Sequence, residues 1–92
     1  MIFTHKVETA YPNTTAPGRD AGGAQIELWS ICAEMASRGL TSGEQSAQCV
    51  SDGQQGMICT RYFTSEEAAQ EFAGHVHRLF AQVEHSSVII PV

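Results

Sequence analysis

The chain opens with a short stretch in which apolar and β-branched residues dominate. From Ile2 to Thr9 it contains neither Gly nor Pro, and Phe3, His5 and Val7 fall on one side of an extended backbone. This composition predicts a strand. The following stretch, Ala10 to Gly23, is rich in Pro, Gly, Asn and Thr, which favour turns. A loop of this length in a compact domain is typical of a lid or a binding loop.

The spacing of apolar residues then becomes helical. Four of them recur at i, i+3, i+4 and i+7, namely Leu28, Ile31, Cys32 and Met35. This pattern predicts a helix from Ala24 to Arg38 with the stripe against a core, and Trp29 widens the stripe. Gly39 suits the left-handed position after the helix, and Leu40 follows where a Schellman motif places an apolar residue.

Two further strands and a turn come next. Glu44 to Val50 predicts a weaker strand and Met57 to Phe63 a clear one. Between them, Ser51 to Gly56 contains an Asp-Gly pair, which is a strong local signal for a turn. The sequence therefore predicts a β-hairpin.

The second helix has the clearest start signal. Thr64 and Glu67 have the spacing of a capping box. The apolar positions that follow share one face: Ala69, Phe72, Ala73, Val76, Leu79, Phe80 and Val83. Ser86 to Val92 then predicts a last strand, and Pro91, which cannot donate to a ladder, places this strand at an edge.

The order of elements is thus strand, helix, strand, strand, helix, strand. This is the split βαβ order of the ferredoxin-like motif. We expect an α+β fold in which two helices cover one face of a four-stranded antiparallel sheet. A chain of 92 residues leaves room for a single domain, residues 1–92.

The predicted strands carry apolar residues on both faces of the sheet. Strand 57–63 places Phe63 on one face and Tyr62 on the other, and the last strand places Ile89 opposite Ile90. Two helices cover one face only, so a monomer would expose an apolar patch. We therefore expect a homodimer through the second face.

The charge of the chain limits its partners. The formal net charge is −5, with five Lys and Arg in all. Nucleic-acid binding requires several basic side chains to neutralise phosphates, so we expect no nucleic-acid partner. An anionic membrane surface is disfavoured for the same reason. No apolar run approaches the roughly 20 residues that span a bilayer, and the N-terminus lacks a secretory signal, so we expect a cytoplasmic protein.

The three cysteines, Cys32, Cys49 and Cys59, form no C-x-x-C pair. We expect all three to be small buried side chains with free thiols. A bridge between Cys49 and Cys59 across the hairpin stays open as an alternative.

The order of elements, together with the segment Tyr-Phe-Thr-Ser-Glu-Glu-Ala-Ala at residues 62–69, resembles the dimeric α+β barrel superfamily. That group includes the antibiotic-biosynthesis monooxygenase-like and stress-responsive barrel families. The resemblance implies two sheets packed face to face and a ligand cavity between sheet and helices. It also implies that catalytic members use an Asn on the first strand, where this chain has His5 and Lys6.

Four side chains are candidates for ligand binding. Arg61 lies mid-strand on a face predicted to be buried, so its guanidinium needs an anionic partner, either a carboxylate such as Glu8 or Glu44 or a bound ligand. His5 is a weak candidate for an acid or base. Trp29 and Tyr62 suit the wall of a pocket for a flat or oily ligand.

The histidines do not predict a metal site. His75 and His77 are two residues apart, which places them on different sides of a helix. No cofactor-binding string is present, so we expect neither a metal nor a cofactor.

Three functional hypotheses follow. The first is a homodimeric protein that binds a small apolar or carboxylate-bearing ligand. The second is a cofactor-independent monooxygenase or isomerase in the same cavity, with His5 as base and Arg61 or Tyr62 holding an oxyanion. The third is a structural or assembly domain.

Overall fold

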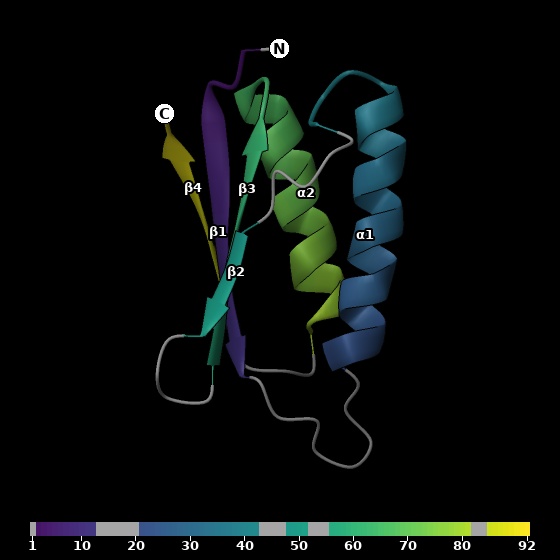
Figure 1. Ribbon diagram of the computed structural model, residues 1–92, viewed down its shortest axis with the longest axis vertical. Helices are drawn as coiled ribbons and strands as arrows, with labels where there is room; N and C mark the ends of the chain where they lie inside the picture. The colour runs from purple at the N-terminus through teal and green to yellow at the C-terminus, as the bar shows by residue number, and fades with distance from the viewer. Residues whose placement is uncertain (1, 13–20, 43–47, 52–55, 82–84) are drawn as a thin grey trace.

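A computed structural model describes residues 2–12, 21–42, 48–51, 56–81 and 85–92 of the chain (Figure 1). The elements follow the expected order: β1 His5–Pro12, α1 Ala21–Ser37, β2 Gln48–Ser51, β3 Gly56–Phe63, α2 Glu66–Leu79 and β4 Ser86–Pro91. Two helices and an antiparallel sheet confirm the α+β class.

The strands form one sheet in the order β2-β3-β1-β4, and every neighbouring pair is antiparallel. Both helices lie on the same side of this sheet, as Figure 1 shows. Helix α2 packs over β1 and β4, and α1 lies beside it. β4 is an edge strand, as Pro91 near its end requires.

The hydrophobic core lies between the helices and the sheet. Its buried members come from all the larger elements: Val7, Leu28, Cys32, Met35, Phe63, Ala68, Ala69, Phe72, Val76 and Phe80. The predicted stripes are therefore confirmed for Leu28, Cys32 and Met35 of α1 and for Ala69, Phe72 and Val76 of α2. Burying side chains of this size stabilises the fold by about 1.5–3 kcal/mol for each large one.

The end of α1 is a Schellman motif, as predicted. Gly39 has φ of 75°, the left-handed region that glycine adopts without strain. Its amide donates to Ala36, and the Leu40 amide donates to Met35 at 3.0 Å. The buried Thr41 hydroxyl then donates to the Tyr62 carbonyl at 2.7 Å, which fixes the chain leaving α1 onto β3.

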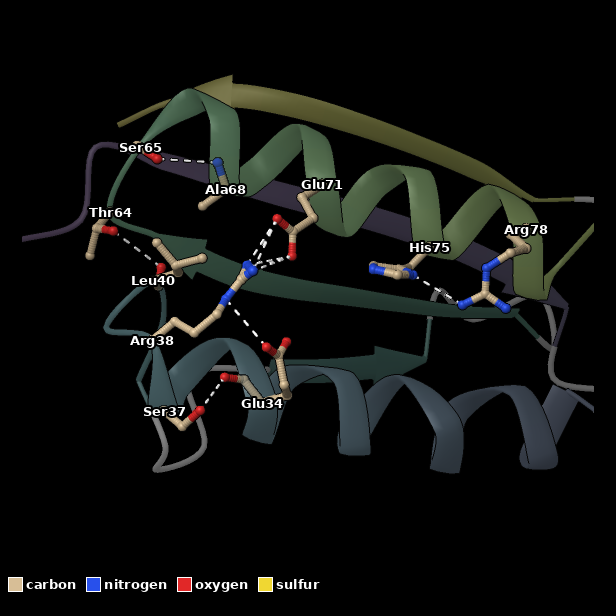
Figure 2. Close-up of polar contacts among 10 residues, drawn as sticks. All are labelled: Glu34, Ser37, Arg38, Leu40, Thr64, Ser65, Ala68, Glu71, His75 and Arg78. Atoms are coloured by element: carbon tan, nitrogen blue, oxygen red, sulfur yellow. Dashed lines mark hydrogen bonds and ion pairs between the residues drawn. The ribbon is translucent and has the colours of Figure 1, made fainter.

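The predicted capping box of α2 is wrong by one residue. The N-cap is Ser65, whose hydroxyl accepts from the Ala68 amide at 3.1 Å. Thr64 instead faces the end of α1, because its amide donates to the Leu40 carbonyl at 3.0 Å. Its hydroxyl is turned to the same carbonyl, at 3.3 Å (Figure 2). A tertiary contact with the end of α1 therefore delays the start of the helix by one residue.

Other boundaries also differ from expectation. β1 begins at His5 instead of Ile2, since its register partners end at Phe63 on β3 and Pro91 on β4. α1 begins at Ala21 and includes Gly22 and Gly23 in its first turn, where tertiary context overrides the weak propensity of glycine. The predicted strand residues 44–47, the turn at 52–55, Val83 and most of the Ala10–Gly23 loop lie outside the described residues.

The register defines two faces of the sheet. The helix face carries His5, Val7 and Thr9 of β1, Cys59, Arg61 and Phe63 of β3, and Ser87 and Ile89 of β4. The open face carries Lys6, Glu8 and Ala10, Ile58, Thr60 and Tyr62, and Val88 and Ile90. In the described part of the chain, neither helix is long and apolar enough to cross a bilayer.

Candidate ligand-binding site on the helix face

Two hydroxyl groups on the helix face have no hydrogen-bond partner among the described residues. Thr9 is 4% exposed, and Ser87 is its direct register partner on β4. The hydroxyl oxygens of both are buried, and neither bonds to a described residue. Direct partners in an antiparallel pair have Cβ atoms about 4.5–5.5 Å apart. The two hydroxyls are therefore neighbours that leave hydrogen bonds unmade.

Arg61 lies next to this pair on the other side of β1. It is the register partner of Val7, so it is a diagonal neighbour of Thr9. Diagonal neighbours are roughly 7–8 Å apart, within reach of a long side chain. The strand pairing thus brings a guanidinium and two hydroxyls onto adjacent positions of three strands.

A thiol on α1, that of Cys32, belongs to the core between the helices and the sheet. Cys32 is buried and free. Burial raises the pKa of the Cys32 thiol above its ordinary value, and the positive charge of Arg61 acts in the opposite direction. The Arg61 side chain is half-buried, and its charge acts on the Cys32 thiol of α1.

The surroundings of these polar groups are apolar. Val7 is fully buried beside Thr9, and Ile89 packs against the core beside Ser87. Leaving a buried hydroxyl unpaired in such surroundings costs about 1–3 kcal/mol. A set of buried donors in an apolar layer has the composition of a small-molecule site.

His5 lies at the other end of the same face. It is four residues from Thr9 along β1, roughly 13 Å at the rise of a strand. Its Nδ1 contacts the Thr4 hydroxyl at 2.9 Å. The structure therefore does not bring His5 to the Thr9–Ser87 pair.

The two aromatic candidates lie elsewhere. Tyr62 is on the open face, where its ring packs against Phe3 with centroids 5.8 Å apart. Trp29 does not widen the buried stripe of α1, because it is 57% exposed. The stripe of Leu28, Cys32 and Met35 is narrow since α1 packs mainly against α2. Four predicted ligand-binding residues are thus spread over three surfaces.

Glu8 is not placed to balance the charge of Arg61 on the helix face. It lies on the open face, where its carboxylate is 3.7 Å from Lys6. Glu44, the other carboxylate considered, lies outside the described residues.

The expectation of three free thiols is wrong for one of them. Cys59 is disulfide-bonded. The register places the backbone of Cys49 directly opposite Cys59, which is the spacing that a bridge across a hairpin needs. Because disulfides are rare in reducing compartments, cysteine usage does not support the expected cytoplasmic location.

The histidines of α2 point in different directions, as their spacing predicts. His75 Nδ1 contacts the Arg78 guanidinium at 3.0 Å, whereas His77 Nδ1 contacts His85 Nε2 at 2.9 Å. In the described part of the chain, no three His, Cys, Asp or Glu side chains are placed to hold a metal ion.

Thr9 and Ser87 were not among the sequence candidates. Period-two alternation does place Thr9 on the same face as Val7, and Ser87 on that of Ile89. A polar residue at an alternating position that is otherwise apolar was the feature of the sequence that could have indicated these two residues. That the two are direct neighbours depends on register, which the alternation leaves open.

Comparison with known proteins shows the fold alone. No protein-family model matches the chain, and no curated protein does. A protein of unknown function from Nitrosomonas europaea, NE2512, is similar in structure, with a TM-score of 0.51 and 12% identity over 98% of this chain and 89% of that one. A putative antibiotic biosynthesis monooxygenase from Chloroflexus aurantiacus J-10-fl has a TM-score of 0.37 and 15% identity, over 95% and 92%.

Proposed function

We propose that this protein binds a small carboxylate-bearing molecule between its sheet and its helices. The observation that carries the proposal is the pair of buried hydroxyls of Thr9 and Ser87, which have no partner among the described residues. Buried polar groups in proteins are normally hydrogen-bonded, and an exception needs an explanation. A ligand that accepts from both hydroxyls explains this pair.

The chemistry of the three strand residues favours a carboxylate. Hydroxyls of Thr9 and Ser87 donate, and the Arg61 guanidinium donates in a planar fork that matches a carboxylate. Hydrogen bonds to a charged acceptor are roughly twice as strong as neutral ones. The Cys32 thiol, protonated because burial raises its pKa, adds no negative charge to oppose such a ligand.

The apolar residues around these groups favour a ligand with a hydrocarbon body. Val7 and Ile89 lie on the same face of the sheet as the hydroxyls, and Leu28 belongs to the same core cluster. An aryl or short alkyl carboxylate presents both chemistries. Binding without catalysis is the proposed activity, because His5 lies roughly 13 Å along β1 from Thr9 and Tyr62 is on the other face of the sheet.

Two variants test the site, with benzoate as the probe and benzamide as its neutral counterpart. We expect benzoate to raise the melting temperature and benzamide to have no effect. Arg61→Gln and Thr9→Val should each weaken benzoate binding at least tenfold in calorimetric titration. Arg78→Gln makes the same change at an exposed arginine of α2 and should bind as the parent does. Binding by Arg61→Gln at parental affinity, or no response to benzoate or hexanoate, would contradict the proposal.

We further propose that two chains pack through the open face of the sheet, as in a dimeric α+β barrel. Ile58, Tyr62 and Ile90 are only half-buried there, and Val88 is 52% exposed. Among the described residues of β1, β3 and β4, the charged side chains on this face are Lys6 and Glu8, which pair with each other. A surface that is apolar and locally neutral suits a second copy of itself.

The oligomeric state tests this second part separately. We expect native mass spectrometry to detect a dimer of the parent chain and a monomer of Ile90→Glu. Ala33→Glu places the same charge on an exposed position of α1 and should leave the dimer intact. If the parent chain is monomeric at micromolar concentration, the proposed dimer through the open face is wrong.

A further inference from the structure

One row of residues across the sheet joins the disulfide to the two unpaired hydroxyls. Thr9 of β1 is the direct register partner of Cys59 on β3 and of Ser87 on β4. Cys59 in turn is opposite Cys49 on β2. The row therefore crosses all four strands, and it places a group that can be oxidised and reduced directly beside a hydroxyl of the proposed carboxylate site.

The disulfide partner of Cys59 within the chain follows by elimination. The chain has three cysteines, and the Cys32 thiol is free, which leaves Cys49. A bond to β2 keeps the Cys59 sulfur on the side of its strand that is away from Thr9. The Thr9 hydroxyl accordingly bonds to no described residue.

We propose that this disulfide regulates the carboxylate site, so that the oxidised chain binds the ligand and the reduced chain binds it more weakly. The inference rests on the proposed function. In the oxidised chain, the disulfide sulfur has no hydrogen to donate, and the Thr9 hydroxyl remains available to a ligand. Reduction converts Cys59 to a thiol, which is both a weak donor and a weak acceptor.

The thiol released by reduction competes with the ligand for Thr9. Direct partners in an antiparallel pair have Cβ atoms about 4.5–5.5 Å apart, so a side-chain rotation of Cys59 brings its sulfur to the Thr9 hydroxyl. The ligand must then break this hydrogen bond before it can make its own. Because hydrogen bonds to sulfur are weak, we expect reduction to lower the affinity by about threefold.

A dithiol is the chemical class of reductant that the regulation requires. Attack of its thiolate on the disulfide breaks the S–S bond and forms a mixed disulfide, which the second thiolate resolves. Each cysteine sulfur gains one electron and one proton, and the dithiol loses two of each as it closes its own disulfide. Cys59 is half-buried and lies one strand from the sheet edge at β2.

The regulation acts in both directions. If reduction lowers the affinity for the ligand by some factor, the bound ligand must oppose reduction by the same factor. A chain that holds its ligand is therefore expected to keep its disulfide at a dithiol concentration that reduces the empty chain.

The first test compares benzoate binding by the two forms in calorimetric titration. Excess dithiothreitol gives the reduced chain, and mass spectrometry after alkylation in urea should count three modified thiols there and one in the oxidised chain. We expect the dissociation constant to be about three times larger in the reduced form. Cys49→Ser leaves Cys59 as a thiol, so it should bind as the reduced parent does and should not respond to dithiothreitol.

The second test needs no ligand. Equilibration with mixtures of reduced and oxidised dithiothreitol measures how readily the disulfide is reduced. Thr9→Val removes the partner of the released thiol, so the equilibrium constant for reduction should fall by about threefold. Thr60→Val makes the same change beside Cys59 but on the open face, and it should leave this constant unchanged.

The outcomes separate the regulation from the proposed function. Equal benzoate affinity of the two parent forms would overturn the regulation and leave the binding proposal standing. A constant for reduction that is the same in Thr9→Val as in the parent would also overturn the regulation. Absence of benzoate binding by the oxidised parent would overturn the proposed function and the regulation together.

Discussion

Thr9 and Ser87 occupy directly opposed positions of β1 and β4, and both hydroxyl oxygens are buried without a partner among the described residues. A third buried hydroxyl, that of Thr41, donates to the Tyr62 carbonyl at 2.7 Å. The Thr41 hydroxyl therefore contributes a hydrogen bond to the fold, whereas the hydroxyls of Thr9 and Ser87 contribute none to a described residue.

This contrast predicts opposite effects of the same substitution. Thr9→Val replaces an unpaired buried hydroxyl by a methyl group, so the free energy of unfolding should stay unchanged or rise by up to about 1 kcal/mol. Thr41→Val removes a donor and leaves the Tyr62 carbonyl unpaired, so it should lower that free energy by about 1–3 kcal/mol. Chemical denaturation of both variants measures the difference. A loss of more than about 1 kcal/mol in Thr9→Val would mean that a bound water already satisfies the hydroxyl.

Two glycines predict a second pair of opposite effects. Gly39 has φ of 75°, and Gly74 lies within α2 with nothing near the position of a Cβ atom. Gly39→Ala should destabilise the protein by about 1–2 kcal/mol, because an alanine at positive φ is strained. Gly74→Ala should stabilise it by roughly 0.5–1 kcal/mol, because alanine has the higher helix propensity. Thermal unfolding checks both, and a stable Gly39→Ala would show that the Schellman end tolerates another conformation.

The buried thiol predicts slow chemical modification that depends on pH. Burial raises the pKa of Cys32, so the thiolate fraction at pH 8 is smaller than in an ordinary cysteine. Iodoacetamide should therefore react with Cys32 much more slowly in the native protein than in urea, and the rate should still be rising above pH 9. Arg61→Gln removes the charge that opposes this rise in pKa and should slow the reaction further. A native rate equal to that in urea would contradict the burial of the thiol.

The pKa of Cys32 also gives the sign of a pH effect on stability. The thiol is a weaker acid in the folded chain than in the unfolded one, so the unfolded state loses its proton first as the pH rises. The contribution of Cys32 to stability is therefore complete below the pKa of the unfolded thiol and declines above it. Cys32→Ser, compared with the parent between pH 7 and 10, isolates this contribution.

A salt bridge links the two helices. The Arg38 guanidinium on the chain leaving α1 is 2.7 Å from Glu71 on α2, and its Nε is 3.3 Å from Glu34 (Figure 2). The Arg38 and Glu71 side chains are about 40% exposed. Solvent therefore screens this pair, and its coupling energy should be about 1 kcal/mol or less. A double-mutant cycle of Arg38→Ala and Glu71→Ala measures it, and the coupling should shrink in 1 M salt. A coupling that is unchanged by salt would indicate a contact dominated by packing.

The local elements of this protein were predictable because their signals are carried by near neighbours in the chain. Gly39 and Leu40 specify the Schellman end through contacts within one helical turn, and the stripe of Phe72 and Val76 is a matter of helix period. Alternation along β1 placed Val7 on the buried face in the same way.

Errors arose where a distant segment competes with a local signal. Thr64 has the sequence of an N-cap, but the Leu40 carbonyl takes its hydrogen bonds, so Ser65 caps α2 instead. Trp29 is apolar and next to the buried stripe, yet it is exposed because α1 packs mainly against α2. Neither outcome is encoded within a few residues of the side chain concerned.

The amino-acid sequence by itself determined the order of the elements, the buried stripes of the helices and the apolar character of both sheet faces, because each depends on residue type and local periodicity. Only the tertiary structure decided which polar groups become neighbours. Strand register joined Thr9 to Ser87 and placed Arg61 diagonally across from Thr9, and the arrangement of α2 and β4 brought His85 to His77. Register and helix docking are set by the whole core at once, which is why the candidate sites could not be assembled from the sequence alone.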